Sequence, residues 1–423
     1  MLPLAVFTAI LTLTVSLYQF FAFNRLKKYI LSELGSKRTL PQTARPKVSV
    51  IMPCKGMDQG FSENLKVLLN QDYFDNSNSP NYEVIFVLGS SSDDAFIHIK
   101  SALDNYPKTK TKLIIAPPQY KNVHKLNSQL TGLKACDKES QIIVFVDSDV
   151  VASANFLENL IAPLDDKSIG LTTGYRFYIP SSYNIPGLLR TVWNRVSAWE
   201  MADPKLVFAW GGAMACRTET ISKINLFKLW ENCADDDLSL TKAVKDLGLK
   251  VKFVPACLVA SYADGSFAEI REWTNRQLLL LKYYYTELWL KAMANAIILF
   301  LITILQLFFA VFYLLTYNPV CLIPLMSAFF LLLSELLLFL SSHKFWYQIL
   351  IKPWYENKFV SHKIDLDFYE SFNKSLMQFY FILPLAHLIL PIISLTSIFI
   401  NTLKWRGLTY KINKPHDITV VST

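Results

Sequence analysis

Residues 141–149 read Gln-Ile-Ile-Val-Phe-Val-Asp-Ser-Asp and are the most informative stretch of this chain. The unbroken apolar run 142–146 predicts a strand that is buried on both faces, as in a parallel sheet. Ligands of such sheets bind beyond the carboxyl ends of the strands, and Asp147 and Asp149 follow this strand directly. Their spacing lets both carboxylates reach one hard cation, Mg²⁺ or Mn²⁺, that holds a diphosphate. The alternative is a pair of solvated acids that ends a strand.

The segments before and after this strand predict an α/β fold with a mostly parallel sheet. Apolar runs over 48–53, 82–88 and 112–116 are strand candidates, and helical patterns separate them near 62–70, 95–104, 122–135 and 153–163. Neither a G-x-G-x-x-G motif nor a Walker loop follows any of these strands, so the sequence supports neither a dinucleotide Rossmann site nor a P-loop.

Further charged residues lie where the predicted elements meet. Asp93 and Asp94 follow strand 82–88, where they either bind a base or ribose or cap the next helix. Asp235-Asp236-Asp237 precedes a helix that ends near Gly248. The helix dipole explains one or two of these acids, and a third, its pKa raised by crowding, suits a general base. Lys121 and Lys125 share a helix face and either meet a phosphate or are ordinary surface lysines.

Composition narrows the class of protein. The chain has 423 residues, enough for two or three domains, with 52% hydrophobic and 18% charged residues, which excludes disordered and collagen-like chains. The six Cys form no C-x-x-C pair, so there is no zinc framework, and a reducing compartment is expected. The net charge of +8 lies beside hydrophobic runs rather than in a basic aromatic stripe, so we expect no nucleic-acid partner.

The hydrophobic runs predict an integral, multi-pass membrane protein. Residues 2–23 are uncharged and long enough to span a bilayer, and the basic stretch 24–47 marks its cytoplasmic side. Residues 292–343 fit two helices with a corner at 317–319. The run 375–403 contains Pro384 and Pro391 and is either a kinked span or a re-entrant hairpin.

These runs also predict the domains and their sides of the membrane. We expect an anchor (1–24), a cytoplasmic domain (25–290), membrane helices with a basic loop near 344–374 (291–403) and a tail (404–423). Four simple spans would put the basic tail outside, against the positive-inside rule. Glu335 and His387 lie within the apolar runs, where they are either functional groups or polar groups paired inside the helix bundle or near an interface, and we expect the latter.

The ordered motifs resemble the membrane-bound family 2 type glycosyltransferases, and most closely the ceramide glucosyltransferase branch. The resemblance runs from the anchor to the tail and rests on V-S-V-I-M-P-C-K-G (48–56), D-D (93–94), K-L-N (125–127), D-S-D (147–149), W-G-G-A-M-A-C-R (210–217), D-D-D-L-S-L (235–240) and W-R-G-L-T-Y (405–410). It implies a GT-A-like (Rossmann-like) domain that transfers a hexose from a nucleotide sugar, UDP-glucose, to a membrane lipid hydroxyl with inversion. A bound Mg²⁺ or Mn²⁺ is implied as cofactor.

The resemblance also implies roles for residues at matching positions. Asp93 or Asp94 would contact the nucleotide, Asp147 and Asp149 would hold the metal, and Lys125 and Asn127 would lie near the donor. Asp237 matches the base, with Asp236 the acid before it. Two features depart from the family pattern: Leu88-Gly89 replaces paired acids after the second strand, and the R/Q-x-x-R-W motif is imperfect. Its nearest counterpart contains Arg271, Glu272, Trp273 and Arg276, and either arginine is a candidate to offset diphosphate charge.

The acceptor end of the site and the reaction class leave alternatives open. Segment 183–210 mixes Trp193, Trp199 and Trp210 with basic residues and is either an interfacial helix that admits lipid or an ordinary core helix. The rival functions are a transferase that acts on a polyprenyl phosphate, a processive polysaccharide synthase and a non-catalytic membrane scaffold.

Overall fold

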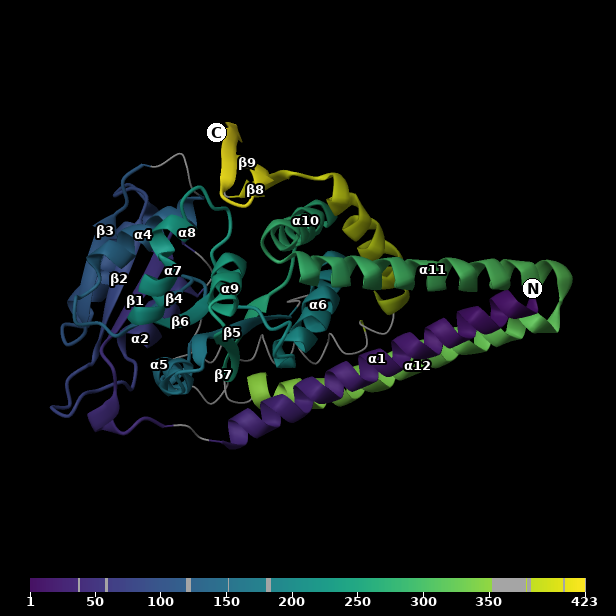
Figure 1. The fold of residues 1–423 in the computed structure, drawn as a ribbon, viewed down its shortest axis with the longest axis horizontal. Coiled ribbons are helices and arrows are strands. Elements are labelled where there is room, and N and C mark those ends of the chain that lie inside the picture. The colour runs from purple at the N-terminus through teal and green to yellow at the C-terminus, as the bar shows by residue number, and fades with distance from the viewer. Residues whose placement is uncertain are drawn as a thin grey trace.

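The computed structural model describes residues 1–36, 39–57, 60–118, 123–150, 152–179, 184–351, 378, 382–405 and 408–422. Within these ranges the chain forms an α/β domain with one large mixed sheet, a set of long apolar helices and a small C-terminal sheet (Figure 1). The mostly parallel α/β architecture predicted from the sequence is thereby confirmed.

Seven strands of the described chain form the large sheet in the order β3-β2-β1-β4-β6-β5-β7. Its first half consists of β1 (Val48–Cys54), β2 (Tyr82–Leu88), β3 (Lys110–Ile115) and β4 (Ile142–Val146), all parallel, as the apolar runs predict. The chain builds outward from β1 to β3 and then returns to place β4 on the other side of β1. The order therefore reverses between β1 and β4, and such a switch point is where open parallel sheets bind ligands.

The second half of the sheet was not anticipated from the sequence. β5 (Ile169–Ile179) and β7 (Lys250–Tyr262) are parallel to each other, whereas β6 (Ala213–Arg217) runs antiparallel to both β4 and β5. Because β6 is antiparallel, it begins at the same edge where β4 ends. The loop before β6 is held there by a hydrogen bond from the Asp147 amide to the Gly212 carbonyl (3.2 Å).

Helices cover both faces of the sheet and enclose two apolar clusters. Alternate residues of a strand point to opposite faces, so Ile51 and Phe145 lie in one cluster and Val50 and Val144 in the other. The helices of this domain are α2 (Phe61–Leu69), α3 (Asp94–Asn105), α4 (His124–Ala135), α5 (Phe156–Ile161), α6 (Ile185–Ala198), α7 (Thr218–Ile224), α8 (Leu226–Leu229), α9 (Asp237–Asp246) and α10 (Phe267–Tyr284). Those predicted near 62–70, 95–104, 122–135 and 153–163 match α2 to α5 within a few residues, α5 being extended by a 3₁₀ turn to Asp165.

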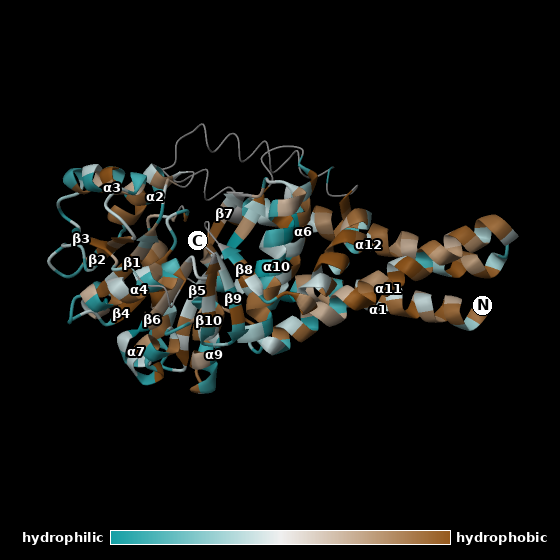
Figure 2. Cartoon of the chain, turned by 90° about the horizontal axis from the view of Figure 1, so that it is seen from above, coloured by the Kyte–Doolittle hydropathy of each residue, from teal (hydrophilic) through white to brown (hydrophobic). Residues whose placement is uncertain are grey.

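Four helices of the described chain are long and apolar enough to span a membrane: Leu2–Gly35 (α1), Thr286–Thr316 (α11), Pro319–Ile349, which contains α12 (Leu322–Trp346), and Ile382–Phe399. Figure 2 shows α1, α11 and α12 as strongly hydrophobic helices that project from the α/β domain. The predicted corner between α11 and α12 is present, with Tyr317 in the left-handed region (φ 53°) and Asn318 capping the next turn. The last of the four helices is continuous over 382–396 and includes Pro384 and Pro391. The apolar run was predicted to begin at residue 375, and of residues 375–381 only residue 378 is described.

The C-terminal residues form a small antiparallel sheet of β8 (Thr402–Trp405), β9 (Leu408–Lys414) and β10 (Asp417–Ser422). Tyr410 and Ile412 are buried in the same apolar cluster as Phe145 of the large sheet, and the His416 ring meets Tyr284 of α10 edge-on. The tail therefore packs against the α/β domain, and both lie at the same end of the long helices (Figure 1).

Candidate active site

A cavity of about 810 Å³ opens at the switch point between β1 and β4. Its walls come from the ends of these strands, the start of α3, the loop before β6, the start of α9 and one face of α10. Sequence segments that are far apart in the chain thus meet at one edge of the sheet, as predicted for the acidic motifs.

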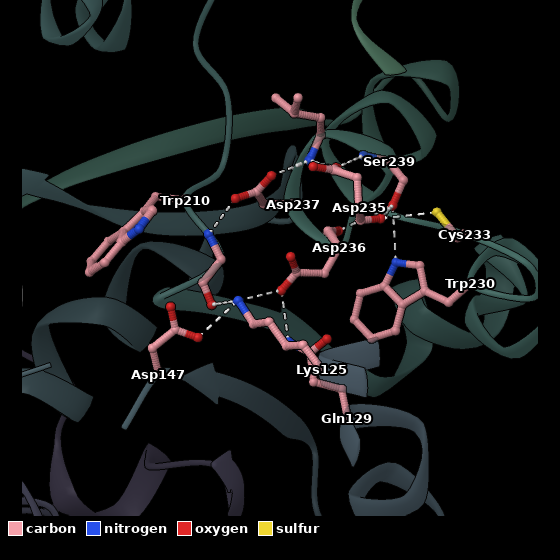
Figure 3. Close-up of polar contacts among 12 residues, drawn as sticks. Lys125, Gln129, Asp147, Trp210, Trp230, Cys233, Asp235, Asp236, Asp237 and Ser239 are labelled. Carbon is pink, nitrogen blue, oxygen red and sulfur yellow. Dashed lines mark hydrogen bonds and ion pairs between the residues drawn. The ribbon is translucent and has the colours of Figure 1, made fainter. Parts of the chain in front are cut away.

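Lys125 of α4 connects two of these motifs. Its Nζ lies 2.8 Å from Asp147 Oδ1 and 2.9 Å from Asp236 Oδ2, and it also donates to the Gly211 carbonyl at 3.2 Å (Figure 3). Burial alone would lower the pKa of Lys125, but Asp147 and Asp236 outweigh it and the pKa is raised. Lys125 is therefore a fixed cation that cross-links α4, the end of β4 and the start of α9.

Asp149 is bound by a residue that the sequence analysis missed. Arg176 of β5 forms a two-point ion pair with this carboxylate, Nη1 to Oδ2 at 2.7 Å and Nη2 to Oδ1 at 2.5 Å. Burial opposes ionisation, yet this guanidinium keeps the pKa of Asp149 lowered. The Arg176 guanidinium carbon also lies 4.9 Å from the ring centre of Trp210, a cation–π geometry. A lone Arg in the run Tyr-Arg-Phe-Tyr-Ile (175–179) was the available signal, because a buried Arg requires an acidic partner.

The first acid of the Asp235-Asp236-Asp237 motif stabilises the start of helix α9. Asp235 is buried, and its Oδ1 accepts the backbone N–H groups of Leu238 (2.7 Å) and Ser239 (3.1 Å) in the first turn of α9. It fills the capping role that the helix dipole predicts for one of these acids. Burial, together with the charges of the next two acids, raises its pKa well above the usual value.

The other two acids face the cavity with different partners. Asp236 Oδ2 binds both Lys125 and the Gln129 side-chain amide (2.8 Å), so this carboxylate is fixed. Among the described residues Asp237 has no such ion pair, and its Oδ2 accepts the Gly211 N–H at 2.7 Å. Burial and the neighbouring Asp236 raise the pKa of Asp237 to about 7. A carboxyl group with that pKa takes and gives up a proton near neutral pH.

The two acids after β2 differ in position. Asp93 lines the cavity and accepts the Gly56 N–H with both oxygens (2.9 and 3.1 Å), while Oδ1 also accepts Ala95 N–H at the start of α3. The predicted helix cap and the predicted cavity residue are therefore the same side chain. Asp94 is exposed and is not part of the cavity wall.

On α10, Trp273 and Arg276 line the cavity, whereas Arg271 is exposed and lies away from it. Trp273 is held between the ring of Tyr178, edge-on at 5.7 Å, and the guanidinium of Arg190, 5.4 Å from the indole centre. Together with Arg176, Arg276 gives the cavity wall two guanidinium groups near the strand-end acids.

Of the K-L-N motif, Lys125 and Leu126 line the cavity. Asn127 is buried and donates to the Pro117 carbonyl (2.8 Å), so it braces the chain that leads from β3 into α4 and does not line the cavity. Lys121 lies outside the described residues.

The strand-end acids supply suitable ligands for a divalent cation. Among the described residues, no three His, Cys, Asp or Glu side chains converge on a ready-made metal site. Asp147 and Asp149 nevertheless both line the cavity, with 26% and 33% of their side chains exposed. Mg²⁺ commonly binds through one or two carboxylates and completes its shell with phosphate and water oxygens. The carboxylates of Asp147 and Asp149 are therefore suitable ligands for a divalent cation that binds together with a diphosphate.

The family to which the chain belongs defines its class as a glycosyltransferase. The chain belongs to glycosyl transferase family 21, whose sequence model matches residues 5–418. The glycosyltransferase part of the resemblance is thereby confirmed over nearly the whole chain.

Three solved structures share a distant similarity with this chain. A mannosyltransferase from Pyrobaculum calidifontis, in complex with GDP-Man and Mn²⁺, has a TM-score of 0.44 and 19% identity, with 65% of this chain and 73% of that chain covered. GalNAc-T7 with UDP, GalNAc and Mn²⁺ has a TM-score of 0.37 and 14% identity over 51% of this chain and 44% of its own. TarS of S. aureus has a TM-score of 0.33 and 18% identity over 55% and 40%.

Proposed function

We propose that this protein transfers a hexose, with glucose from UDP-glucose as the first candidate, to a hydroxyl group of a membrane lipid. The proposed activity is that of a ceramide glucosyltransferase-like enzyme, with inversion at the sugar carbon. One observation carries the proposal: Asp237, whose pKa is about 7, lines the same cavity as the strand-end pair Asp147 and Asp149.

The donor diphosphate would lie between the acidic and the basic parts of this cavity. Asp147 and Asp149 would hold Mg²⁺ or Mn²⁺, which when bound supplies positive charge to the departing diphosphate. Arg276 and Arg176 face the same space and would offset further negative charge as it develops. Asp93, fixed by the Gly56 amide, is a candidate to accept a hydrogen bond from the nucleotide.

Asp237 would act as the general base. In a single displacement the acceptor hydroxyl attacks the sugar carbon from the face opposite the diphosphate, and Asp237 accepts its proton. Asp236 is already bound by Lys125 and Gln129, so its part in this scheme is to raise the pKa of Asp237 through its charge.

The acceptor would come from the bilayer, with the catalytic domain facing the cytoplasm. α6 and the 3₁₀ turn after it carry Trp193 and Trp199 between the α/β domain and the long helices, as suits an interfacial element (Figure 1). Because the tail packs against the α/β domain, we propose that it also faces the cytoplasm. The helix Ile382–Phe399 would then not be a fourth simple crossing, which removes the conflict with the positive-inside rule.

The proposal is tested with the purified full-length protein in detergent, mixed lipid acceptors, several labelled nucleotide sugars and Mg²⁺ or Mn²⁺. We expect a labelled lipid from UDP-glucose that falls by about 10²–10⁴-fold in Asp237→Asn. The matched control is Asp246→Asn at the other end of α9, where the acid is exposed and pairs with Lys242. A labelled polymer would favour a polysaccharide synthase, and a product on polyprenyl phosphate alone would favour that acceptor. Product formation that is equal in Asp237→Asn would remove Asp237 from the mechanism.

A further inference from the structure

A second cavity, of about 230 Å³, lies among the long helices. Its wall is formed by described residues of α1, α6, α11, α12 and the helix Ile382–Phe399. Most of these side chains are apolar, including Phe23, Leu288, Leu299, Leu338 and Ala386. An apolar space between membrane-spanning helices suits a hydrocarbon chain.

This cavity adjoins the catalytic one. Trp193, Ser197, Phe208 and Leu281 line both, so the two spaces share a wall of only a few side chains. A lipid whose polar end reached the catalytic cavity would therefore have its hydrocarbon part directed to the second cavity.

The depth of the second cavity corresponds to one leaflet of a bilayer. On α12 its wall runs from Trp346 to Glu335, and on α11 from Leu288 to Leu299. Each pair is eleven residues apart, which is roughly 16 Å of helix at ~1.5 Å per residue. Half of a hydrocarbon core of about 30 Å is about 15 Å, the depth that the chains of one leaflet reach.

A buried polar cluster lies at the deep end of this wall. Glu335 Oε1 accepts the side-chain amide of Gln19 at 2.8 Å and lies 3.1 Å from His387 Nε2. The prediction that Glu335 and His387 are paired inside the bundle is confirmed. Glu335 is 7% exposed, and its other oxygen, Oε2, is buried without a hydrogen-bond partner among the described residues. A hydrocarbon chain gains nothing by passing a carboxylate, because the polar group would be desolvated further.

Three further charged side chains, Lys291, Glu200 and Arg195, line the wall, and the Arg195 guanidinium lies over the rings of Phe177 and Phe339 at 5.0 and 4.8 Å. Lys291 pairs with Glu200 at 2.7 Å, and the Tyr18 hydroxyl donates to the same carboxylate at 3.3 Å. Lys291, Glu200 and Tyr18 satisfy one another and leave the apolar part of the wall to contact a ligand.

We infer that the second cavity binds one hydrocarbon chain of the acceptor lipid, and that the cluster of Glu335, His387 and Gln19 sets the longest chain that fits. The inference rests on the proposed function, since it takes the acceptor to be a lipid whose hydroxyl reaches Asp237. It specifies the acceptor class as an ordinary bilayer lipid with a chain of leaflet length. A polyprenyl chain, which is much longer than one leaflet, exceeds this cavity.

The test compares two neighbouring positions of α11. Ala296 is 4% exposed and lines the second cavity, whereas Ile297 is 41% exposed on the outer face. Ala296→Phe adds a ring inside the cavity, and Ile297→Phe adds similar bulk outside it. Acceptors with one headgroup and short, medium or leaflet-length chains are used with each variant. The ratio of kcat/KM for long over short chains should fall about tenfold or more in Ala296→Phe, because each excluded methylene forfeits about 0.8 kcal/mol of burial. It should not change in Ile297→Phe.

A second pair of variants tests the opposite change. Leu338→Ala enlarges the cavity and should improve the use of branched chains, whereas Leu337→Ala, at an exposed position of the same helix, should not. Activity on short-chain acceptors shows that each variant is folded. Identical chain-length and branching profiles in all four variants would overturn the inference.

Binding separates this inference from the proposed function. Native mass spectrometry with long-chain alcohols, without donor, should show a bound chain in wild type and Ile297→Phe and loss of it in Ala296→Phe. That pattern without any sugar transfer would reject the proposed function and retain the chain site. Sugar transfer without any difference in chain binding between the variants would reject the chain site and retain the proposed function.

Discussion

Replacing Lys125 by Met should destabilise the α/β domain strongly, because this lysine is the shared partner of two buried carboxylates. Its Nζ lies within 2.9 Å of both Asp147 and Asp236, and only 16% of its side chain is exposed. Removing one partner of a buried ion pair costs about 3–5 kcal/mol, since the remaining charge is left uncompensated. For a domain of this size about 1 kcal/mol corresponds to roughly 2–4 °C, so the unfolding midpoint of Lys125→Met should fall by about 6–20 °C.

The dependence on pH and metal makes this prediction specific. Protonated carboxyl groups need no cation, so the loss of stability should shrink as the pH is lowered towards the ordinary pKa of an aspartate. Mn²⁺ should restore part of it at neutral pH, because a divalent cation also compensates Asp147. The assay is thermal unfolding of the purified protein in detergent, followed by intrinsic fluorescence, at several pH values with and without Mn²⁺.

Lys242→Met is the matched control. Lys242 pairs with Asp246 at 3.2 Å on the exposed face of α9, with 56% of its side chain in solvent. An exposed pair of this kind contributes at most about 0.5 kcal/mol. Equal unfolding midpoints for the Lys125 and Lys242 variants at neutral pH would refute the argument that Lys125 balances the two acids.

Three further predictions follow from the cavity. The raised pKa of Asp237, about 7 from burial and Asp236, means that the base loses its proton only near neutrality; kcat/KM should fall about tenfold per unit below that pH, and a flat profile down to about pH 5 would contradict the assignment. Arg176→Gln frees both oxygens of Asp149, so Mn²⁺ should bind several-fold more tightly in the absence of nucleotide. Electron paramagnetic resonance measures this affinity, and an unchanged value would show that the ion pair does not compete with the metal. Gly211→Ala would bring a methyl group to 2.8 Å from both Asp236 Oδ2 and Lys125 Nζ, so it should cost about 1–3 kcal/mol of stability and lower kcat. The control Gly35→Ala meets open space, and similar losses in both glycine variants would exclude this steric reason.

Half of the sheet was predictable because its strands are continuous apolar runs. β1, β2 and β4 are buried along their whole length, or nearly so, and carry the signal typical of parallel strands. β5 carries no such signal, since Gly170, Thr172, Thr173 and Gly174 interrupt it. Gly174 lies against the Cys257 backbone of β7, where a side chain would collide. The residues that obscure this strand in the sequence are the ones that its close packing requires.

The candidate site was predictable where residue type and strand position agree. Asp147, Asp149, Asp236, Asp237 and Lys125 all line one cavity, because each lies at a strand or helix end on the same edge of the sheet. Asp94 and Arg271 were also candidates, but each is exposed and away from the cavity wall. Their neighbours Asp93 and Arg276 face the cavity, and only the three-dimensional direction of each side chain distinguishes them.

Arg176 was missed because its function depends on an unpredicted strand. β5 lies beside β6 and brings Arg176 to the end of β4, where Asp149 is its partner. The C-terminal sheet was missed for a related reason, since β8 to β10 lack the continuous apolar runs of β1, β2 and β4 and gain their burial against α10 and the large domain.

The anomeric configuration of the product tests the central claim most directly. Asp237 as base requires a single displacement, so transfer from UDP-α-glucose to a lipid hydroxyl should give only the β-glucoside by nuclear magnetic resonance. The same product should form at a much lower rate in Asp237→Asn and at the normal rate in Asp246→Asn. An α-linked product, or a covalent glycosyl–protein intermediate, would contradict the account.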